Sequence, residues 1–317
     1  MLITEILERA REPLYSYEII PPRRGGSLDD ILRIVDDLAA FRPPFIDVTS
    51  HSAQESFEQK EDGTWRRTAK RKRPGTLGLC AAIKSRYGIE TVPHLLCLGF
   101  TREETEDALI ELQYLGIDNL MALRGDDHGH VNPMPPDRTR NEYAVDLVHQ
   151  VAAMNRGKYL EPLADTKGTN FCVGVAGYPE KHFEAPNLSW DLERLKAKVD
   201  AGAHYITTQM FFDNAHYFRF QEACTALGIS IPIIPGLKII TSKRQLQVLP
   251  RVFHLDLPDD LCAEIMAADD KHVPEIGAQW TIKQTEELVN AGVPCVHYYI
   301  MQSTRHVRTV VSHMQKL

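Results

Sequence analysis

The sequence has no excess of positive charge, no paired cysteines and no long apolar run. Its formal net charge is −7, which argues against a nucleic-acid-binding protein because such proteins normally carry a basic excess. None of the six cysteines forms a CxxC pair and no spacing is typical of zinc, so we expect reduced, buried thiols and no metal site. No segment approaches the ~20 apolar residues of a membrane helix, and the acidic N-terminal segment lacks a signal-peptide core, so we expect a cytoplasmic protein without a membrane partner.

Two glycine-rich phosphate-binding motifs are also absent. No GxGxxG follows an apolar run, and no GxxxxGK[ST] occurs in the chain. The first predicted strand continues instead into PPRRGG at 21–26. An open doubly wound sheet usually carries a glycine-rich turn after its first strand, so its absence disfavours that fold.

Eight short apolar runs, rich in β-branched and aromatic residues, recur along the 317 residues. Their nearly continuous apolar character is typical of strands that are covered on both faces. The predicted strands are Tyr15–Ile20, Phe45–Thr49, Val92–Leu98, Asn119–Leu123, Phe171–Ala176, Tyr205–Met210, Ile231–Pro235 and Cys295–Met301.

Segments with helical periodicity lie between these strands. Thr101 and Glu104 form a capping box at the start of one helix, and Gly116 follows its end as a C-cap. Repeated strand–helix alternation predicts an α/β fold, a single (β/α)8 TIM barrel in one domain spanning residues 1–317, with the open doubly wound sheet as the alternative. The predicted helices are Leu28–Phe41, Thr101–Leu115, Trp190–Ala201, Ala215–Leu227 and Ile276–Ala291.

A basic segment follows the second predicted strand. Within Gln54–Gly75, residues 66–73 contain six lysines and arginines. One interpretation is a solvated loop, and the other is an electrostatic landing site for the anionic tail of a ligand.

Glu18 is a carboxylate inside the apolar first strand. Burying an unpaired charge is costly, so this side chain should be paired, hydrated or protonated. A buried ion pair with a neighbouring strand is one interpretation. Because active sites of such barrels lie at the C-terminal ends of the strands, we favour a carboxyl group with a raised pKa that acts as a general acid.

Polar residues close the other predicted strands as well. Arg124, Gly125 and Asp126 end the fourth strand, and the glycine allows the backbone to approach a ligand closely. His94 lies in the third strand, where a structural core histidine is the alternative to a functional one. Gln209 ends the sixth strand and could make a two-pronged amide contact with a heterocycle. The predicted strand ends lack a nucleophilic serine or cysteine with a base, and they lack a Schiff-base lysine. This favours a cofactor-dependent reaction on a planar ligand.

Seven ordered segments resemble the methylenetetrahydrofolate reductase family of bacterial type, as a catalytic domain alone. The resemblance spans nearly the whole chain in colinear order. The segments are YSYEIIPPR at 15–23, VPHLLCL at 92–98, GIDNLMALRGD at 116–126, GYPEKHFEA at 177–185, KAKVDAGAHYITTQMFFD at 196–213, IPIIPGLK at 231–238 and VHYYIMQ at 296–302.

The resemblance implies that FAD binds at the C-terminal ends of the strands. It also implies a ping-pong reaction, in which NADH or NADPH reduces the flavin and the flavin then reduces 5,10-methylenetetrahydrofolate to 5-methyltetrahydrofolate. Reduced nicotinamide and the folate would be the small-molecule partners, and a homo-oligomer is expected. The choice between NADH and NADPH stays open, because no ribose-binding signature is identifiable.

The same resemblance implies roles for individual residues. Glu18 corresponds to the general acid that protonates N10 of the folate, and Asp126 to a carboxylate near the flavin pyrimidine end and the pterin. Gln209 and Gln245 correspond to substrate-binding positions. The positions that surround FAD correspond to Thr49, His94, Arg124, Gly125, Asp126, Tyr143, Ala144, Tyr178, His182, Asp191 and Lys198.

The end of the last strand departs from the family pattern. Where the family often has a Leu-Asn-Arg segment whose arginine reaches the folate glutamate, this chain has Met301, Gln302 and Ser303, with Arg305 two residues later. Arg305 or the basic segment is therefore the candidate for holding the folate tail. Two other functions stay open: a flavin-free pterin-binding barrel in methyl transfer, and a non-catalytic subunit that retains the barrel.

Overall fold

Nine parallel strands form the main sheet of the computed structural model, which describes residues 1–317 except 52–53, 71–72, 74, 126–135, 302 and 317. The strands are hydrogen-bonded in the order β10-β11-β1-β2-β5-β6-β7-β8-β9. Their bounds are β1 Leu14–Ile19, β2 Phe45–Val48, β5 Glu90–Leu96, β6 Asn119–Leu123, β7 Cys172–Gly177, β8 Tyr205–Thr208, β9 Ile233–Ile234, β10 Gly236–Leu237 and β11 Cys295–Met301.

The sheet closes on itself through the two shortest strands. β9 pairs with β8 and β10 pairs with β11, and only Pro235 separates β9 from β10. The carbonyl oxygen of Pro235 accepts a hydrogen bond from the backbone N–H of His297 at 2.9 Å, so one chain segment joins both edges. β9 and β10 together occupy one strand position, which gives eight positions and confirms the predicted (β/α)8 barrel.

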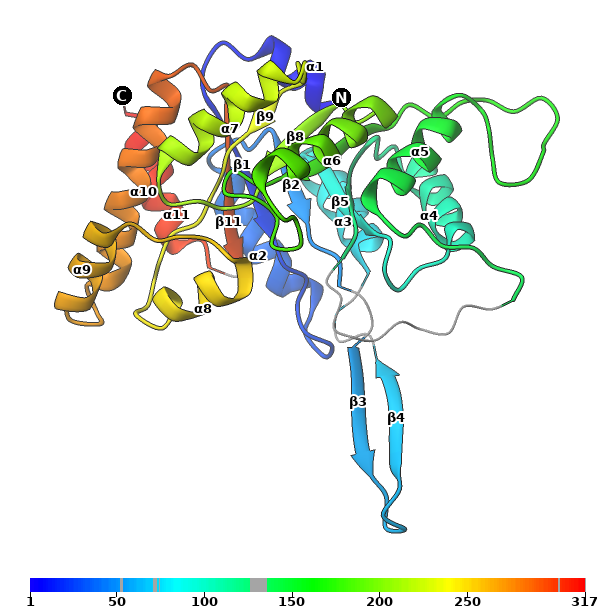
Figure 1. Cartoon of the computed structure of the whole chain (residues 1–317), viewed down its shortest axis with the longest axis horizontal. Coiled ribbons are helices and arrows are strands. Elements are labelled where there is room, and N and C mark those ends of the chain that lie inside the picture. Colours follow the sequence, from blue (N-terminus) through cyan, green and yellow to red (C-terminus); the bar gives the residue numbers. More distant parts are fainter. Residues whose placement is uncertain (52–53, 71–72, 74, 126–135, 302, 317) are drawn as a thin grey trace.

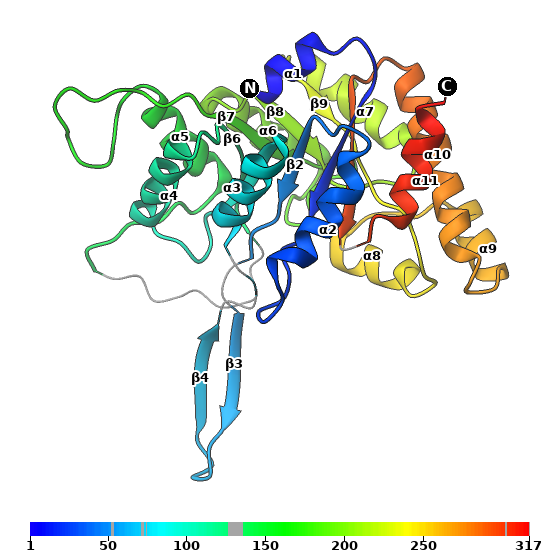
Figure 2. The ribbon, with the colours of Figure 1, turned by 180° about the vertical axis from the view of Figure 1, so that it is seen from behind.

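Helices surround the strands on the outside of the barrel, as the two opposite views show (Figures 1 and 2). Within the described residues, no helix is long and apolar enough to span a membrane. The bounds are α1 Ile3–Arg9, α2 Leu28–Ala39, α3 Thr76–Tyr87, α4 Arg102–Tyr114, α5 Ala144–Asn155, α6 Leu188–Ala201, α7 Asn214–Ala226, α8 Gln245–Phe253, α9 Asp259–Ala267, α10 Val273–Asn290 and α11 Arg305–Met314.

The predicted signals at the ends of α4 are present. The hydroxyl oxygen of Thr101 accepts from the backbone N–H of Glu104 at 3.1 Å, and the Glu104 carboxylate accepts from the N–H of Thr101 at 2.8 Å. Gly116 follows the helix with φ of +66°, a left-handed conformation that glycine adopts without strain. These local interactions begin and end the helix where the sequence predicts.

The helix α1, which was not predicted, covers the N-terminal ends of the strands. Its buried residues Ile3 and Leu7 pack with inward-facing apolar residues of the barrel, including Phe45, Val92 and Tyr205. The backbone N–H of Ile3 also donates to the Asn119 side chain at 2.9 Å. The floor of the barrel is therefore apolar and covered, and its polar chemistry lies toward the other end.

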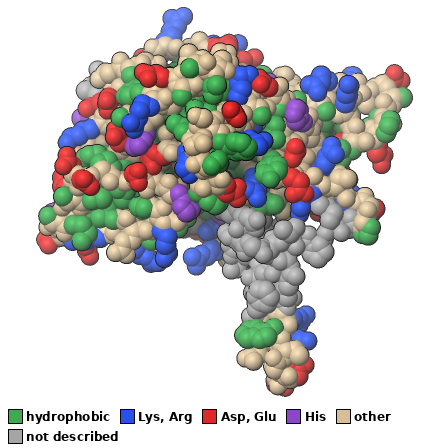
Figure 3. Space-filling model, viewed as in Figure 1, with side chains coloured by type: hydrophobic (Ala, Val, Ile, Leu, Met, Phe, Trp, Pro, Cys, Tyr) green, Lys and Arg blue, Asp and Glu red, His purple; other side chains and the backbone are tan. Residues whose placement is uncertain are grey.

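The prediction of a loop after the second strand was wrong, because this segment forms the antiparallel hairpin β3 Gln54–Gln59 and β4 Trp65–Lys70. The Asp62 carboxylate accepts from the Thr64 backbone at 2.9 Å and Gly63 has φ of +80°, which closes a tight turn. The hairpin projects beyond the C-terminal ends of the strands (Figure 1). Its far end carries hydrophobic, basic and acidic side chains together (Figure 3).

Candidate active site

The upper part of the barrel interior is polar. Along β1, Tyr15, Tyr17 and Ile19 pack in the core between strands and helices, so Ser16 and Glu18 face the interior. The parallel register places Glu18 beside Asp47 of β2 on one side and beside Tyr299 of β11 on the other. The C-terminal half of the barrel thus holds an ionisable group on each of three neighbouring strands.

Glu18 is poised near neutral pH. Its side chain is only 16% exposed, and burial raises its pKa to about 7, because desolvation disfavours the carboxylate. The positive charges of His94 and Lys238 oppose this effect, whereas the negative charge of Asp47 adds to it. A substantial fraction of Glu18 is therefore a neutral acid at neutral pH, and its residual exposure leaves it accessible from the site.

His94 of β5 contacts two carboxylates through one ring nitrogen. Its Nε2 lies 3.3 Å from Asp47 Oδ2 and 3.6 Å from Glu18 Oε2. Burial opposes the charged form of His94, but the hydrogen bond with Asp47 and the charges of both carboxylates outweigh it and raise the pKa of the imidazole. The interpretation of His94 as a simple core histidine is incomplete, because the ring links Glu18 to Asp47.

Lys238 completes the charged group from the other side of β1. It follows β10, is 8% exposed, and its Nζ donates to the backbone carbonyl of Tyr299 at 3.3 Å. Burial lowers its pKa, and the charge of Glu18 partly opposes that change. The hydroxyl of Tyr299 donates to the Thr208 carbonyl at 2.6 Å, which ties the end of β11 to β8.

A second group of side chains extends outward from β6 toward the start of α5. Arg124 Nη1 donates to the Glu184 carboxylate at 2.5 Å, and its guanidinium carbon lies 5.4 Å from the ring centre of Tyr143. Tyr143 is 59% exposed and precedes Ala144, the first residue of α5. Gly125 has φ of +90°, which an L side chain rarely adopts, so the chain turns sharply there.

The loop after β7 is held close to this second group. The rings of Tyr178 and His182 meet edge to face at 4.7 Å, and the His182 backbone N–H donates to Asp191 at 2.8 Å. Lys198 of α6 donates to the Ala176 carbonyl at 2.6 Å, and burial lowers its pKa to about 8 while Asp191 opposes that change. These four residues surround the end of β7, next to Arg124 and its partner Glu184.

A model of the family described as methylenetetrahydrofolate reductase matches residues 2–315. The chain belongs to this family of oxidoreductases. It is 31% identical over 289 residues to the 5,10-methylenetetrahydrofolate reductase of Salmonella typhimurium and 30% identical to that of Escherichia coli, and each alignment covers 90% of this chain and 85% of the relative.

Longer members of the methylenetetrahydrofolate reductase family also match. The chain is 31% identical to methylenetetrahydrofolate reductase 2 of Saccharomyces cerevisiae, over 95% of its own length but 47% of the yeast protein, so it spans about half of that relative. Among solved structures, a protein from Clostridium thermocellum that binds two copies of 5-methyl-5,6,7,8-tetrahydrofolic acid superposes with a TM-score of 0.59 at 13% identity, covering 98% of this chain and 97% of that one. That likeness supports the fold alone.

The other residues that the family resemblance assigns to the site follow different elements and differ in their contacts. Thr49 follows β2 and has a buried hydroxyl without a partner among the described residues. Gln209 follows β8, and its side-chain oxygen accepts from the next backbone N–H at 3.0 Å. Gln245 begins α8, where its side-chain oxygen accepts from the backbone N–H of Thr241 at 2.6 Å and so holds the loop that precedes the helix. Asp126 lies outside the described residues.

Two charged residues of the candidate site are not identified as site residues by the sequence. Asp47 is a carboxylate within the apolar run FIDV, which is the same signal that identifies Glu18 in β1. Lys238 is recognisable in the sequence only as a strand end, because its contact with Tyr299 depends on barrel closure. Among the described residues, no group of three or more histidines, cysteines and carboxylates is arranged to hold a metal ion.

Proposed function

We propose that this chain reduces 5,10-methylenetetrahydrofolate to 5-methyltetrahydrofolate, with NADH or NADPH as donor and FAD as carrier in a ping-pong cycle. The observation that carries the proposal is the raised pKa of Glu18. Burial raises this pKa to about 7 in a barrel of the methylenetetrahydrofolate reductase family. The proposal covers one catalytic domain over residues 1–317. A homo-oligomer and a cytoplasmic location remain predictions that accompany it.

The described residues fit FAD, which this family generally uses. Arg124 and Lys198 supply positive charges for a pyrophosphate, and the unpartnered hydroxyl of Thr49 can bond a ring edge. Tyr143 and Tyr178 add aromatic surface for stacking. The proposed surroundings also include His94, Gly125, Asp126, Ala144, His182 and Asp191. When bound, FAD would accept hydride from the nicotinamide and supply it to the one-carbon unit of the folate.

The acid step is assigned to Glu18. Opening the five-membered ring of the substrate requires a proton on N10, and a carboxyl group that is still protonated near neutral pH can donate it. We assign Gln209 to contacts with folate and nicotinamide in turn, and Gln245 to the folate side. Asp126 is proposed as the negative charge near the flavin pyrimidine end and the pterin.

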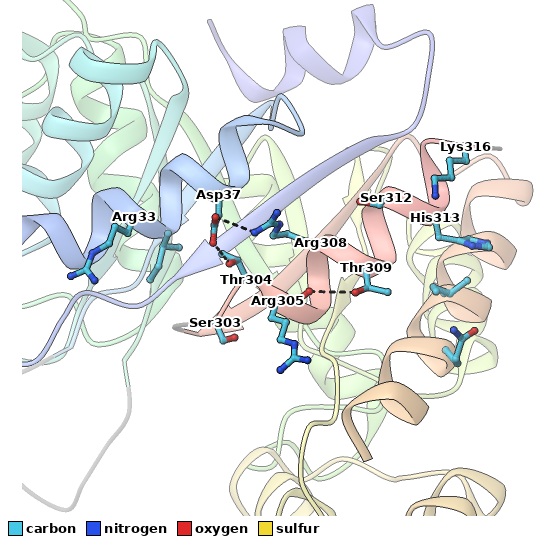
Figure 4. A pocket seen from close by; sticks show the side chains of 13 residues that line it. Arg33, Asp37, Ser303, Thr304, Arg305, Arg308, Thr309, Ser312, His313 and Lys316 are labelled. Carbon is cyan, nitrogen blue, oxygen red and sulfur yellow. Dashed lines mark hydrogen bonds and ion pairs between the residues drawn. The ribbon is translucent and has the colours of Figure 1, made fainter. Parts of the chain in front are cut away.

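Arg305 is the candidate for holding the folate tail. It lies in a groove of about 760 Å³ between α2, α10 and α11, at the point where the chain leaves β11. Arg308 in this groove pairs with Asp37 at 3.1 Å, whereas Arg305 turns away from that pair (Figure 4). Among the described residues Arg305 makes no ion pair, so its charge is available to a carboxylate.

Replacement of Arg305 tests the assignment. Arg305→Ala should raise the KM for methylenetetrahydrofolate roughly tenfold, which corresponds to ~1.4 kcal/mol, and leave nicotinamide oxidation with an artificial acceptor unchanged. Lys316→Ala at the other end of the groove is the matched control. An unchanged KM in the Arg305 variant would remove this residue from the site.

The function itself is tested by anaerobic stopped-flow absorbance. Purified protein should be yellow, NADH or NADPH should bleach the flavin band, and methylenetetrahydrofolate should restore it. A protein that has no flavin band and acquires none from added FAD would overturn the proposal. Folate binding without any nicotinamide oxidation would instead favour the flavin-free barrel in methyl transfer.

A further inference from the structure

One ring nitrogen lies between two carboxylates in the barrel. His94 Nε2 is 3.3 Å from Asp47 Oδ2 and 3.6 Å from Glu18 Oε2, so the single proton on this nitrogen can bond fully to only one of them. The side chains of His94 and Asp47 are 7% and 2% exposed, and that of Glu18 is 16% exposed. The shorter contact belongs to the more buried carboxylate, and Glu18 is the member of the group nearest to solvent.

Without Asp47, Glu18 would be the only carboxylate among the described residues that faces Nε2. Glu18 would lose the negative charge that helps to raise its pKa, and any imidazolium at His94 would pair with Glu18 alone; both changes favour the carboxylate form of Glu18. Glu18 would then be a carboxylate and could no longer donate a proton. A residue that binds the imidazolium of His94 in place of Glu18 would keep Glu18 protonated.

We propose that Asp47 is a positioning residue for the acid step: it binds the protonated His94 and so keeps the acid proton on Glu18. This inference rests on the proposed function, because it assigns Asp47 a task within the same site. The pair formed by His94 and Asp47 is neutral as a whole, and it therefore exerts little net attraction on the Glu18 carboxylate.

The other groups around Glu18 agree with this assignment. Among the described residues, the charged groups that act on Glu18 are His94 from β5, Asp47 from β2 and Lys238 from the end of β10, and of these only Asp47 is negative. Tyr299 of β11 also faces Glu18, and burial raises the pKa of its phenol well above the ordinary value, so it stays neutral. Lys238 is occupied in part by the carbonyl of Tyr299. Asp47 Oδ1 is buried without a hydrogen-bond partner among the described residues, and burial lowers the pKa of the nearby His297 to about 4, so that this second imidazole is neutral. Asp47 is thus the negative charge that offsets the charge of His94.

The variant Asp47→Asn tests the proposal, because it removes the charge and keeps the shape. The rate of the folate half-reaction should begin to fall at a lower pH than in the wild type. At pH values above that fall, the variant should be about tenfold slower than the wild type for every pH unit that separates the two profiles. The pH profile of flavin reduction by the nicotinamide should keep its midpoint, because that half-reaction uses no proton from Glu18. The double variant Asp47→Asn with His94→Gln removes both charges and should return the pH midpoint of the folate half-reaction toward the wild-type value, whatever its absolute rate.

Infrared difference spectroscopy gives a readout that does not depend on turnover. The C=O stretch of protonated Glu18 is identified by its loss in Glu18→Gln, and its disappearance with rising pH gives the titration midpoint. The midpoint should lie near pH 7 in the wild type and at least about one pH unit lower in Asp47→Asn. Equal midpoints in the two proteins would overturn the inference. If the midpoint is lower in Asp47→Asn but the wild-type protein does not reduce methylenetetrahydrofolate, Asp47 does keep the proton on Glu18 and the proposed function is wrong.

Discussion

At the scale of single residues, Glu18 affects stability as well as chemistry. Its pKa is about 7 in the folded protein, against an ordinary value of 4.5, so the folded state binds the proton more tightly between these values. Stability contributed by the protonated form is therefore lost as the pH rises from about 4.5 through 7. The buried carboxyl group of Glu18 thus destabilises the folded protein at alkaline pH relative to acidic pH.

Glu18→Gln should remove this pH dependence. Relative to the wild type, the variant should gain free energy of unfolding between pH 5 and pH 8, by up to about 3 kcal/mol. Urea unfolding at both pH values measures the gain. If the two proteins differ by the same amount at pH 5 and at pH 8, Glu18 does not have a raised pKa in the folded state.

Arg124 is predicted to hold FAD through its charge and its position over Tyr143. Arg124→Ala should weaken FAD binding about tenfold or more, because a charge-assisted contact to a phosphate is typically worth about 1.5–3 kcal/mol. Arg140→Ala is the control, since Arg140 also pairs with a glutamate, Glu142, at 2.7 Å. Flavin fluorescence titration of the apoprotein measures both, and equal losses would assign Arg124 a structural task only.

At the scale of elements, α1 and the hairpin show what local signals leave out. The helix α1 has 7 residues and a short apolar face, which is a weak signal in the sequence, and it is stabilised by packing against the barrel floor. The hairpin depends on the turn at Asp62 and Gly63. Its two strands contain many charged residues, so their sequence does not show the apolar pattern of a strand. Both elements were missed because tertiary packing or turn chemistry, and not hydrophobic periodicity, determines them.

The packing of α1 predicts a stability effect. Ile3 is fully buried against the barrel floor, so Ile3→Ala should lower the free energy of unfolding by about 2–5 kcal/mol. Glu8→Ala, on the exposed face of the same helix, should change it by less than about 0.5 kcal/mol. Chemical denaturation compares the two variants. Similar small effects would mean that α1 does not seal the barrel.

At the scale of the whole molecule, the barrel and part of the site could be predicted from the sequence. Repeated apolar runs indicated the strands, and the position of Glu18 in β1 indicated a buried carboxyl group with a raised pKa, because both depend on local patterns. The link from Glu18 through His94 to Asp47 joins β1, β5 and β2, and no single segment contains it. Closure through Pro235 likewise depends on residues that are distant in the chain.

The central claim is that Glu18 donates the proton for folate reduction, and separate measurement of the two half-reactions of Glu18→Gln tests it most directly. The variant should keep its flavin and be reduced by the nicotinamide at close to the wild-type rate. Reoxidation by methylenetetrahydrofolate should slow by ~10²–10⁴-fold, the usual contribution of a general acid. An equal loss in both half-reactions, or reoxidation at the wild-type rate, would contradict the account.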